Sequence, residues 1–392
     1  MAIKWSKSIS FNFHSGSASC MISPSSEVEL SELLLDSSEP IRIIGGGTRQ
    51  NLGNNVQSKK NISTSKLTGI TLLEPAALTL VVRSGTPLAV VKKSLDEVNQ
   101  QLPFEPMDHC DLLGSSGYST IGGVVACNIS GSRRIQTGAC RDSLIGVRFV
   151  DGMGAIIKNG GRVMKNVTGY DLVKLMAGSY GTLGVMTELS FKLLPKPEAT
   201  ATIILHGLND EEGVAALCKA LGSPNDVSGA AHFNNETLIR IEGFTGSISY
   251  RTETLKKLFS KYEISVVTDT KKNKELWNSI GNVSTFSKTE TSIWRLSVKP
   301  TSGPKIMDTL LKSGIKAEAL YDWGGGLIYL SVPDNINIRD HLFGMQGHIT
   351  LVRGNGGGAK VMPLKNNLIT EIEEGLRNKF DPRKILNVGI MG

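Results

Sequence analysis

The chain lacks the sequence features of several common protein classes. None of its five cysteines lies in a C-x-x-C pair or at ferredoxin spacing, which argues against an iron–sulfur centre or a structural zinc site. An odd, scattered set of thiols is typical of a reducing compartment. No stretch approaches the roughly 18 apolar residues of a membrane-spanning helix, and the first residues contain no signal-peptide core. We therefore expect a soluble, cytoplasmic protein without a metal site.

Positive charge is present without a nucleic-acid signature. The formal charge is +7, yet no run of Lys and Arg interleaved with aromatic residues occurs. Part of the excess falls in a glycine-rich segment, 111–200, which suits a small anionic ligand better than a nucleic acid duplex. A net charge that merely keeps the protein soluble explains the same numbers.

Glycine, in contrast, is abundant, with 43 residues. One cluster, GGGT at 45–48, directly follows the apolar run IRII at 41–44. A strand that ends in glycines turns consecutive backbone N–H groups toward one point, where a phosphate binds. The cluster is not G-x-G-x-x-G, and the polar QNLGNNVQSKKN that follows is no amphipathic helix, which argues against a Rossmann site. A plain tight turn remains the alternative.

A second cluster, YSTIGGVVACNISGSRR at 118–134, offers further compact donors. A buried diphosphate requires many hydrogen bonds with side chains out of the way, and two such loops would hold it from opposite sides. Arg141 beside Asp142, taken alone, is better explained by a surface ion pair. The candidate contacts of this region are Ser119, Thr120, Gly122, Gly123, Gly138, Arg141 and Asp142.

The apolar pattern also predicts the order of elements. A capping box at Ser25 or Ser26 with Glu29 begins a helix that runs through Leu35. Beyond Pro195-Lys-Pro197, strands alternate with amphipathic helices, which is typical of an α+β domain with an antiparallel sheet. We therefore divide the chain into 1–196, 197–355, and a C-terminal helix and tail at 356–392. The other elements expected before residue 197 are strands at 41–44, 79–85 and 184–195, a helix at 88–101, and a hairpin across 143–159.

Together, these motifs resemble a known family. The resemblance is to the FAD-binding subunits of glycolate oxidase (glycolate dehydrogenase), among the vanillyl-alcohol-oxidase, or PCMH-type, flavoproteins. It spans roughly Pro24 to the C-terminus, and the block 163–184 is its most specific part. The segments that carry it are IRIIGGGT, GYSTIGGVVACNISG, TGACRDSLIGVRFVDGMG, GGRVMKNVTGYDLVKLMAGSYGTLGVMTELSFKLLPKP, IWRLSVKP, YDWGGG, GHITLVRG and FDPRKILNVG.

The resemblance implies an α+β fold, in which a two-lobed PCMH-type domain binds FAD and an α+β cap with an antiparallel sheet lies beside the isoalloxazine ring. On this interpretation, glycines remove side chains so that the main chain reaches the cofactor, and a helix at 171–176 packs beneath it. Gly45, Gly46, Gly47 and Thr48, with the adjacent Arg49, would bind the diphosphate first. Ser119, Thr120, Gly122 and Gly123 would close the other side. Gly181, Gly184 and Val185 would approach the adenine half, and Asn387 the flavin edge.

Two positions depart from the family pattern. Members with covalent flavin carry a histidine just after the glycines, where this chain has Thr48. His109 lies outside such a motif, and a lone histidine is usually structural. We therefore expect noncovalent FAD. The tail reads Asn387-Val388-Gly389 where relatives commonly have Asn-Pro-Gly, so its geometry is less closely defined by the family.

The expected chemistry needs more than a flavin. Oxidation of a 2-hydroxy acid requires a base for the hydroxyl proton, a cation for the carboxylate, and the flavin N5 as hydride acceptor. Arg295 and Arg353 are the candidate carboxylate clamps, because the guanidinium fork forms bidentate bonds. No histidine has a context that identifies it as the base.

Three functions follow. The first is an FAD-binding subunit of a glycolate oxidase/dehydrogenase complex that oxidises a small 2-hydroxy acid, with a catalytic FAD subunit and an iron–sulfur subunit as partners. Such a complex leaves open an association with the inner face of the plasma membrane. The second is a self-sufficient FAD-dependent D-2-hydroxy-acid (D-lactate) dehydrogenase. The third is a structural subunit of the same complex that binds no flavin. The lack of cluster cysteines and of an evident base favours the first.

Overall fold

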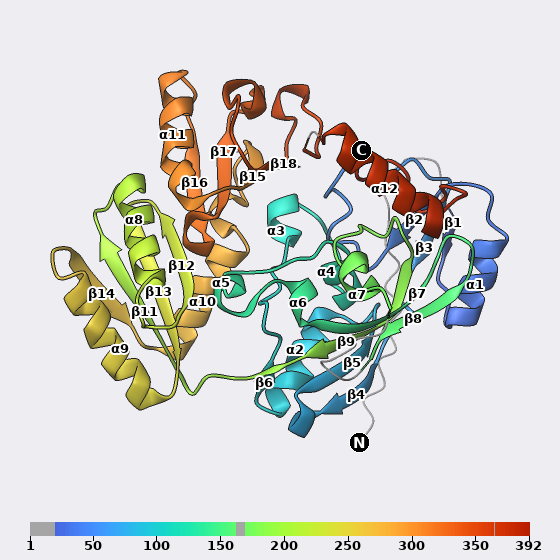
Figure 1. Ribbon diagram of the computed structural model, residues 1–392, viewed down its shortest axis with the longest axis horizontal. Helices are drawn as coiled ribbons and strands as arrows, with labels where there is room; N and C mark the ends of the chain where they lie inside the picture. The colour runs from blue at the N-terminus through green and yellow to red at the C-terminus, as the bar shows by residue number, and fades with distance from the viewer. Residues whose placement is uncertain (1–19, 162–168, 364) are drawn as a thin grey trace.

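The computed structural model describes residues 20–161, 169–363 and 365–392. Part of the GGRVMKNVTGY motif, residues 162–168, lies outside this set. In Figure 1 an N-terminal part with two sheets lies beside a part built on one large sheet, and a C-terminal helix lies over the N-terminal part. None of the described helices combines the length and the apolar composition needed to cross a bilayer.

The first sheet is parallel, and its strand β2 leads directly into the first glycine cluster. It has the order β1 (Cys20–Ile22), β3 (Lys60–Ser63), β2 (Ile41–Ile44). Helix α1 (Glu27–Leu35) begins at Ser26, whose Oγ accepts a hydrogen bond from the Glu29 N–H at 3.1 Å, which confirms the predicted start. Leu30 and Leu34 pack in one core cluster with the strands.

The second sheet is antiparallel and underlies the second glycine cluster. Its order is β4 (Ile70–Glu74), β5 (Thr79–Arg83), β9 (Val185–Lys192), β7 (Leu144–Val150), β8 (Ile156–Gly160). The expected hairpin is confirmed as β7 and β8. A two-stranded ribbon pairs β6 (Gln100–Gln101) with β10 (Leu194–Pro195). The helices of this part are α2 (Leu88–Glu97), α3 (Cys110–Leu113), α4 (Ile121–Ala126), α5 (Arg134–Thr137), α6 (Cys140–Ser143) and α7 (Leu172–Met176).

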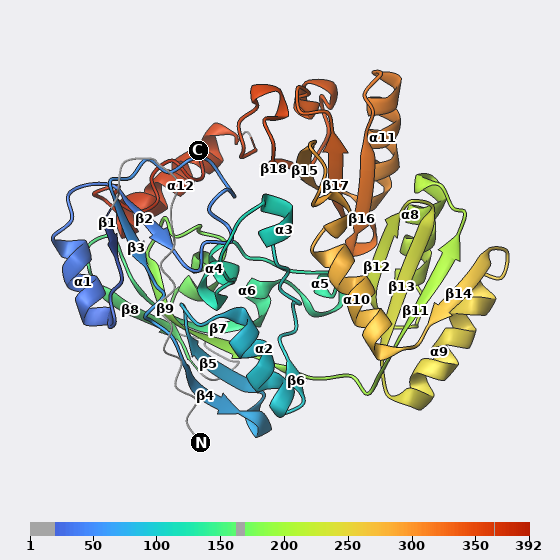
Figure 2. The same ribbon diagram turned by 180° about the vertical axis from the view of Figure 1, so that it is seen from behind.

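The third sheet has eight strands, all paired antiparallel, as expected for the second α+β part. Its order is β14 (Glu263–Val267), β11 (Ala199–His206), β13 (Glu236–Gly243), β12 (Val227–Phe233), β16 (Glu318–Asp322), β17 (Leu327–Val332), β15 (Ser292–Ser297), β18 (His348–Arg353). Its helices are α8 (Asp210–Leu221), α9 (Thr245–Leu258), α10 (Thr270–Gly281) and α11 (Gly303–Lys312). In Figures 1 and 2, α5 lies beside β12 at the junction with the N-terminal part.

The C-terminal segment returns to the N-terminal part. Helix α12 (Asn367–Phe380) ends where the Phe380 carbonyl accepts a hydrogen bond from the Gly152 N–H at 2.7 Å. Arg383 then donates to the Leu34 and Leu35 carbonyls at 2.6 and 2.9 Å. Residue 386 pairs with Ile41 of β2, so the tail reaches the strand that leads into Gly45. The division at 196/197 and 355/356 stays a proposal.

An ionic network joins the two main parts. Glu105, from the N-terminal part, contacts Arg240 of β13 at 2.8 Å and Arg133 at 2.9 Å. Arg133 also contacts Glu242 of β13 at 2.7 Å. Burial alone would raise the pKa of Glu105, but the charges of Arg240 and Arg133 outweigh it and lower that pKa to about 2. Glu105 is therefore ionised, and its ion pairs with the arginines hold the large sheet against the N-terminal part.

Candidate functional site

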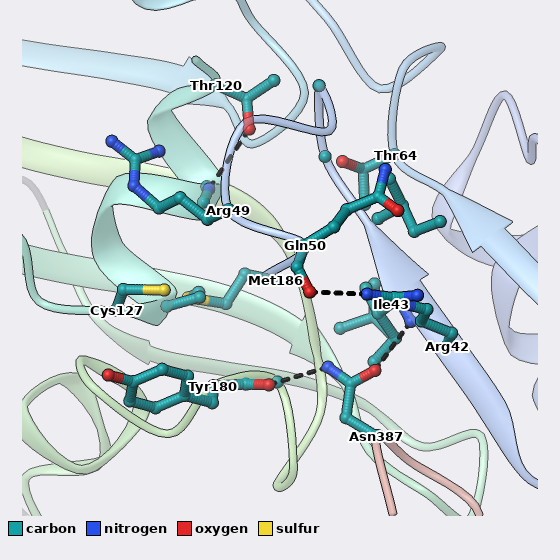
Figure 3. A pocket seen from close by; sticks show the side chains of 18 of the residues that line it. Arg42, Ile43, Arg49, Gln50, Thr64, Thr120, Cys127, Tyr180, Met186 and Asn387 are labelled. Carbon is teal, nitrogen blue, oxygen red and sulfur yellow. Dashed lines mark hydrogen bonds between the residues drawn. The ribbon is translucent and has the colours of Figure 1, made fainter. Parts of the chain in front are cut away.

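A pocket that is partly open to solvent lies where β2 ends. Figure 3 shows it from close by. The residues expected from the sequence that line it are Gly45, Gly46, Gly47, Thr48, Arg49, Thr120, Gly122, Gly123, Gly181, Gly184, Val185 and Asn387. Ser119, Gly138, Arg141 and Asp142 do not line it. Two glycine loops and the tail, distant in sequence, thus meet at one place.

The two glycine loops touch each other directly. The Tyr118 N–H donates to the Gly46 carbonyl at 3.0 Å. A Cβ on Gly46 would lie 2.9 Å from the Tyr118 carbonyl carbon and still closer to its oxygen. A Cβ on Gly117, which has φ +124°, would run into the Gly46 carbonyl in the same way. These glycines are therefore required for the contact between the loops, whereas the sequence interpretation assigned such glycines to contact with the cofactor.

The first loop presents unpaired backbone donors. Within the described part of the chain, the N–H groups of Gly45, Gly46 and Gly47 donate no hydrogen bond. Those of Ser119 and Thr120, on the second loop, likewise have no acceptor among the described residues. Because unpaired N–H groups in a pocket attract an anion, both loops contribute to an anion-binding surface.

The donors of the second loop differ from those expected. The Gly122 N–H already donates to the Ser84 carbonyl at 2.7 Å, and the Gly123 N–H donates to Thr120 Oγ1 at 3.2 Å. A Cβ on Gly122 would lie 2.7 Å from that Ser84 carbonyl oxygen. Gly122 and Gly123 therefore lie in the first turn of α4 and pack it against the residue that follows β5, so their amides are not available to a ligand in this arrangement.

Arg49 and Ser84 supply further polar groups. Arg49 donates from Nη1 to Ser119 Oγ and from Nη2 to the Met107 carbonyl, both at 3.0 Å, and burial lowers the pKa of Arg49. Its Nε and the hydroxyl of Ser84, another pocket residue, are buried without a partner among the described residues. A guanidinium without a carboxylate and an unpaired hydroxyl both suit a polar anionic ligand.

Asn387 joins three segments at the pocket. Its Oδ1 accepts a hydrogen bond from the Ile43 N–H at 2.8 Å, and its Nδ2 donates to the Tyr180 carbonyl at 2.7 Å (Figure 3). These bonds connect β2, the tail and the loop before β9, although the tail lacks the usual Asn-Pro-Gly. The side chain thus has a positioning role that the sequence did not reveal.

The loop before β9 is shaped by close packing. A Cβ on Gly184 would lie 2.7 Å from the Phe149 ring, and one on Gly181, which has φ +71°, would lie 2.8 Å from Asn387 Nδ2. Beneath this loop, α7 buries Val173 and Met176 in the core that includes Phe149. The predicted helix at 171–176 is therefore confirmed, and it begins one residue later.

The remaining candidates near residue 140 form a separate small motif. Asp142 Oδ2 accepts a hydrogen bond from the Ala139 N–H at 2.8 Å, and Asp142 Oδ1 lies 3.7 Å from Arg141 Nε, with both side chains about half exposed. Gly138 precedes this turn with φ +84°. This arrangement is the surface ion pair that the sequence favoured for Arg141 and Asp142 taken alone.

The two candidate carboxylate-binding arginines, Arg295 and Arg353, differ in how far their guanidinium groups are already bonded to the protein. Arg353 donates to the backbone carbonyls of Leu112, Ser287 and Thr289 at 3.0, 3.1 and 2.6 Å, so its fork is occupied by the protein. Arg295 lies with its guanidinium carbon 5.4 Å from the centre of the Trp323 ring and forms no ion pair with a described residue. Arg295 therefore remains the better candidate for an incoming carboxylate.

His109 is buried, with 3% of its surface exposed. Its Nδ1 has no partner among the described residues. Burial lowers the pKa of His109 well below its usual value, and the charges of Arg49 and Arg295 lower it further. The imidazole is thus neutral in this environment.

The pocket fits FAD in the features that the structure shows. A dinucleotide has a doubly charged diphosphate, which the unpaired amides of Gly45–Gly47 and the buried Arg49 match. The apolar residues Ile43, Leu52 and Val56 line the same pocket and suit ring systems.

Comparisons with known proteins agree with this geometry. Residues 18–160 match the FAD binding domain family. The chain is 32% identical over 354 residues to the glycolate oxidase subunit GlcE of Escherichia coli, covering 90% of this chain and 92% of that subunit. It is 47% identical to the glycolate oxidase subunit GlcD of Bacillus subtilis over only 90 residues, 23% of this chain and 19% of GlcD. It is also 28% identical to D-lactate dehydrogenase of Anaerostipes hadrus over 192 residues, 49% of this chain and 39% of that enzyme.

Solved structures share the fold. The 4-ethylphenol oxidase from Gulosibacter chungangensis superposes with a TM-score of 0.70 at 12% identity, covering 95% of this chain and 88% of that one. An alkyldihydroxyacetonephosphate synthase superposes with a TM-score of 0.66 at 16% identity, covering 94% and 76%. The chain, with its FAD-binding domain and antiparallel second sheet, thus belongs to the family of the glycolate oxidase subunit GlcE, FAD-dependent oxidoreductases of the PCMH type.

Proposed function

We propose that the chain is the FAD-binding subunit of a 2-hydroxy-acid oxidase/dehydrogenase complex that oxidises glycolate to glyoxylate, with electrons passed by way of the flavin to an iron–sulfur partner. The observation that carries this proposal is the meeting of Gly45–Gly47 and Thr120 in one pocket, where the backbone N–H groups of these residues donate to no described residue. The similarity to GlcE over nearly its full length supports the choice of complex.

In this proposal the pocket residues bind the cofactor, which when bound supplies a two-electron acceptor for a hydroxyl-bearing carbon. The amides of Gly45–Gly47 and the guanidinium of Arg49 hold the diphosphate. Thr48, which is 3% exposed, offers a hydroxyl where covalent relatives carry an imidazole, so FAD is held noncovalently. Asn387 fixes the tail against the pocket through Ile43 and Tyr180.

A second candidate is a self-sufficient D-2-hydroxy-acid dehydrogenase. The similarity to a D-lactate dehydrogenase favours it, as does Arg295, which forms no ion pair with a described residue. The two candidates differ in whether the isolated chain reacts with substrate. Under the first, the flavin of the isolated chain is reduced only in the presence of the partner subunits. Under the second, D-lactate alone reduces it.

The test is a purification followed by anaerobic spectroscopy. We expect a yellow protein whose flavin is released completely into the supernatant by acid, as noncovalent binding requires. Colour retained in the precipitate would contradict noncovalent binding, and a colourless protein that takes up no added FAD would refute the cofactor assignment. Glycolate or D-lactate is then added to the isolated chain and to the complex purified from native extract. Reduction by glycolate only in the complex supports the first candidate, and reduction by D-lactate in the isolated chain supports the second.

A further inference from the structure

A pair of arginines contacts one tryptophan near the junction of the two parts. The guanidinium carbon of Arg134, on α5, lies 4.3 Å from the centre of the Trp323 ring, and that of Arg295, on β15, lies 5.4 Å from it. The two arginines come from different parts of the chain, and Trp323 directly follows β16. The ring thus brings together two cations that lie far apart in the sequence.

The tryptophan is fixed in place. Its Nε1 donates to the Gly131 carbonyl at 3.0 Å, and its backbone N–H donates to Asp322 Oδ1 at 2.7 Å. The other oxygen of Asp322 accepts a hydrogen bond from Ser132 Oγ at 2.7 Å. Because these bonds join Trp323 to the segment just before Arg134, the ring forms a rigid platform for both guanidinium groups.

Neither cation is neutralised. Both side chains are half buried, yet neither forms an ion pair with a carboxylate in the described part of the chain. Burial lowers the pKa of Arg134, and the charge of Arg295 lowers it further, as expected for like charges held close together. The adjacent Arg133 gives the contrast, because it contacts Glu105 and Glu242 at 2.9 and 2.7 Å. Two partly desolvated guanidinium groups on one ring, neither paired with a carboxylate, favour an anion.

The surroundings connect this pair to the cofactor pocket. Burial raises the pKa of Tyr180, a pocket residue, and the charge of Arg295 opposes that shift. Arg295 also opposes the rise that burial causes in the pKa of Tyr329, its neighbour across the strand pair. The charge of Arg295 also lowers the pKa of His109, whose buried Nδ1 has no partner among the described residues. Neither arginine lines the pocket itself, but Trp323, which carries both, packs against the same core cluster as Tyr180.

We propose that Arg134 and Arg295, held by Trp323, bind the carboxylate of a small organic acid. The identification of that acid as the 2-hydroxy-acid substrate rests on the proposed function, whereas the anion site itself needs no flavin chemistry. Arg134, which sequence reasoning did not single out, thereby joins Arg295 as a binding residue, and Arg353 keeps its bonds to backbone carbonyls.

The test measures binding of oxalate, a two-carbon acid without a hydroxyl group to oxidise, by calorimetry on the full-length FAD-loaded protein. We expect saturable binding to the unaltered protein and at least tenfold weaker binding to Arg134→Gln and to Arg295→Gln. Arg134→Lys, which keeps the charge and loses the fork, should bind with an intermediate affinity. The matched control is Arg83→Gln, because Arg83 is an exposed arginine of β5, and it should bind oxalate as the unaltered protein does. Thermal unfolding and flavin content of each variant show whether it is folded.

The outcomes separate this proposal from the proposed function. Oxalate affinity within twofold of the unaltered value in both folded glutamine variants, or no saturable binding at all, overturns the carboxylate site. If glycolate still reduces the flavin of the complex in that case, the proposed function stands without the site. Arginine-dependent oxalate binding in a protein whose complex glycolate does not reduce supports the site and refutes the proposed function.

Discussion

The contact between the two glycine loops yields a direct prediction for Gly46→Ala. The added Cβ would lie 2.9 Å from the Tyr118 carbonyl carbon and 2.8 Å from a Tyr118 ring atom. Carbon atoms in ordinary contact are about 3.5–4.0 Å apart, and the nearest atoms are backbone, so the loops must separate. Separation also breaks the 3.0 Å hydrogen bond from the Tyr118 N–H to the Gly46 carbonyl.

The expected loss follows from these two effects. Overpacking of a close contact costs about 1–3 kcal/mol, and the lost hydrogen bond adds about 1 kcal/mol. If the resulting 2–4 kcal/mol falls on the state that binds FAD, the dissociation constant rises roughly 30- to 700-fold, because each 1.4 kcal/mol is about tenfold. The assay is a titration of the flavin-free protein with FAD, in which binding is measured from the change in flavin fluorescence.

The matched control is Gly246→Ala. This glycine lies in α9, and a Cβ there meets nothing within 4 Å, so the same added methyl group should leave FAD affinity and stability unchanged or slightly improved. Unaltered FAD affinity in a folded Gly46→Ala protein would refute the reasoning, because the loops would then not need their close approach to form the cradle. A weaker affinity in the Gly246 variant as well would show that the assay reports general destabilisation.

Three further predictions concern the surrounding groups. Glu105→Gln should make the free energy of unfolding less dependent on pH in the acid range. The pKa of Glu105 in the folded protein, about 2, lies below the ordinary 4.5, so its charge contributes up to about 3 kcal/mol of stability above pH 5, and this contribution is lost as pH falls toward 2. Urea unfolding at pH 6 and pH 3 would contradict this if the free energy of unfolding fell by the same amount in the variant and in the unaltered protein. Asn387→Ala should lower the free energy of unfolding by about 2–4 kcal/mol, because the Ile43 N–H and the Tyr180 carbonyl each lose a partner, and an unchanged melting temperature would count against its positioning role. Burial raises the pKa of the pocket residue Cys127 to about 11, so iodoacetamide should label it slowly at pH 8 and more slowly still with FAD bound; mass spectrometry that found equal labelling with and without FAD would contradict the placement of the cofactor.

Local sequence signals predicted the elements that depend on local chemistry. The capped helix α1, the strand β2 and the β7–β8 hairpin follow from capping residues, apolar runs and turn residues, and the structure confirms them. The helix that begins at Leu88 ends at Glu97, short of the expected residue 101, because Gln100 and Gln101 pair with β10. That pairing comes from residues almost a hundred positions away, which no local pattern contains.

Two strands of the large sheet depend on their neighbours rather than on a sequence pattern of their own. The sequence VSGAAHF of β12 is rich in small residues and has no strand signal of its own, yet it pairs with β13 along most of its length and meets β16 at residue 232. Pairing and burial, rather than intrinsic preference, make it a strand. The short β14, at the edge of the same sheet, is likewise defined by its pairing with β11.

In the pocket, too, the sequence motifs predicted the location of the site, whereas the role of each glycine depends on contacts between distant residues. The glycine motifs correctly predicted where the chain would gather, but the reason given for the glycines was incomplete. Gly46 and Gly122 make room for backbone, at Tyr118 and Ser84. The amides of Gly45–Gly47 and Thr120, which donate to no described residue, are left for a ligand in the pocket. Ser84 itself was not foreseen, because a serine after a strand has no distinguishing pattern until α4 packs against it.

Arg133 and Arg134 show most clearly why a binding residue cannot be read from its type alone. They are adjacent and identical in sequence, and both belong to the motif GSRR. Glu105 and Glu242 form ion pairs with Arg133 and neutralise its charge. Arg134 instead lies over the Trp323 ring, which also contacts Arg295. Whether an arginine holds the fold together or awaits an anion therefore depends on which distant carboxylates the fold brings to it. A Glu242→Gln substitution should for this reason affect stability through Arg133 and leave oxalate affinity at the Arg134 site unchanged, and a tenfold loss of that affinity in a folded variant would show that the two arginines are not independent.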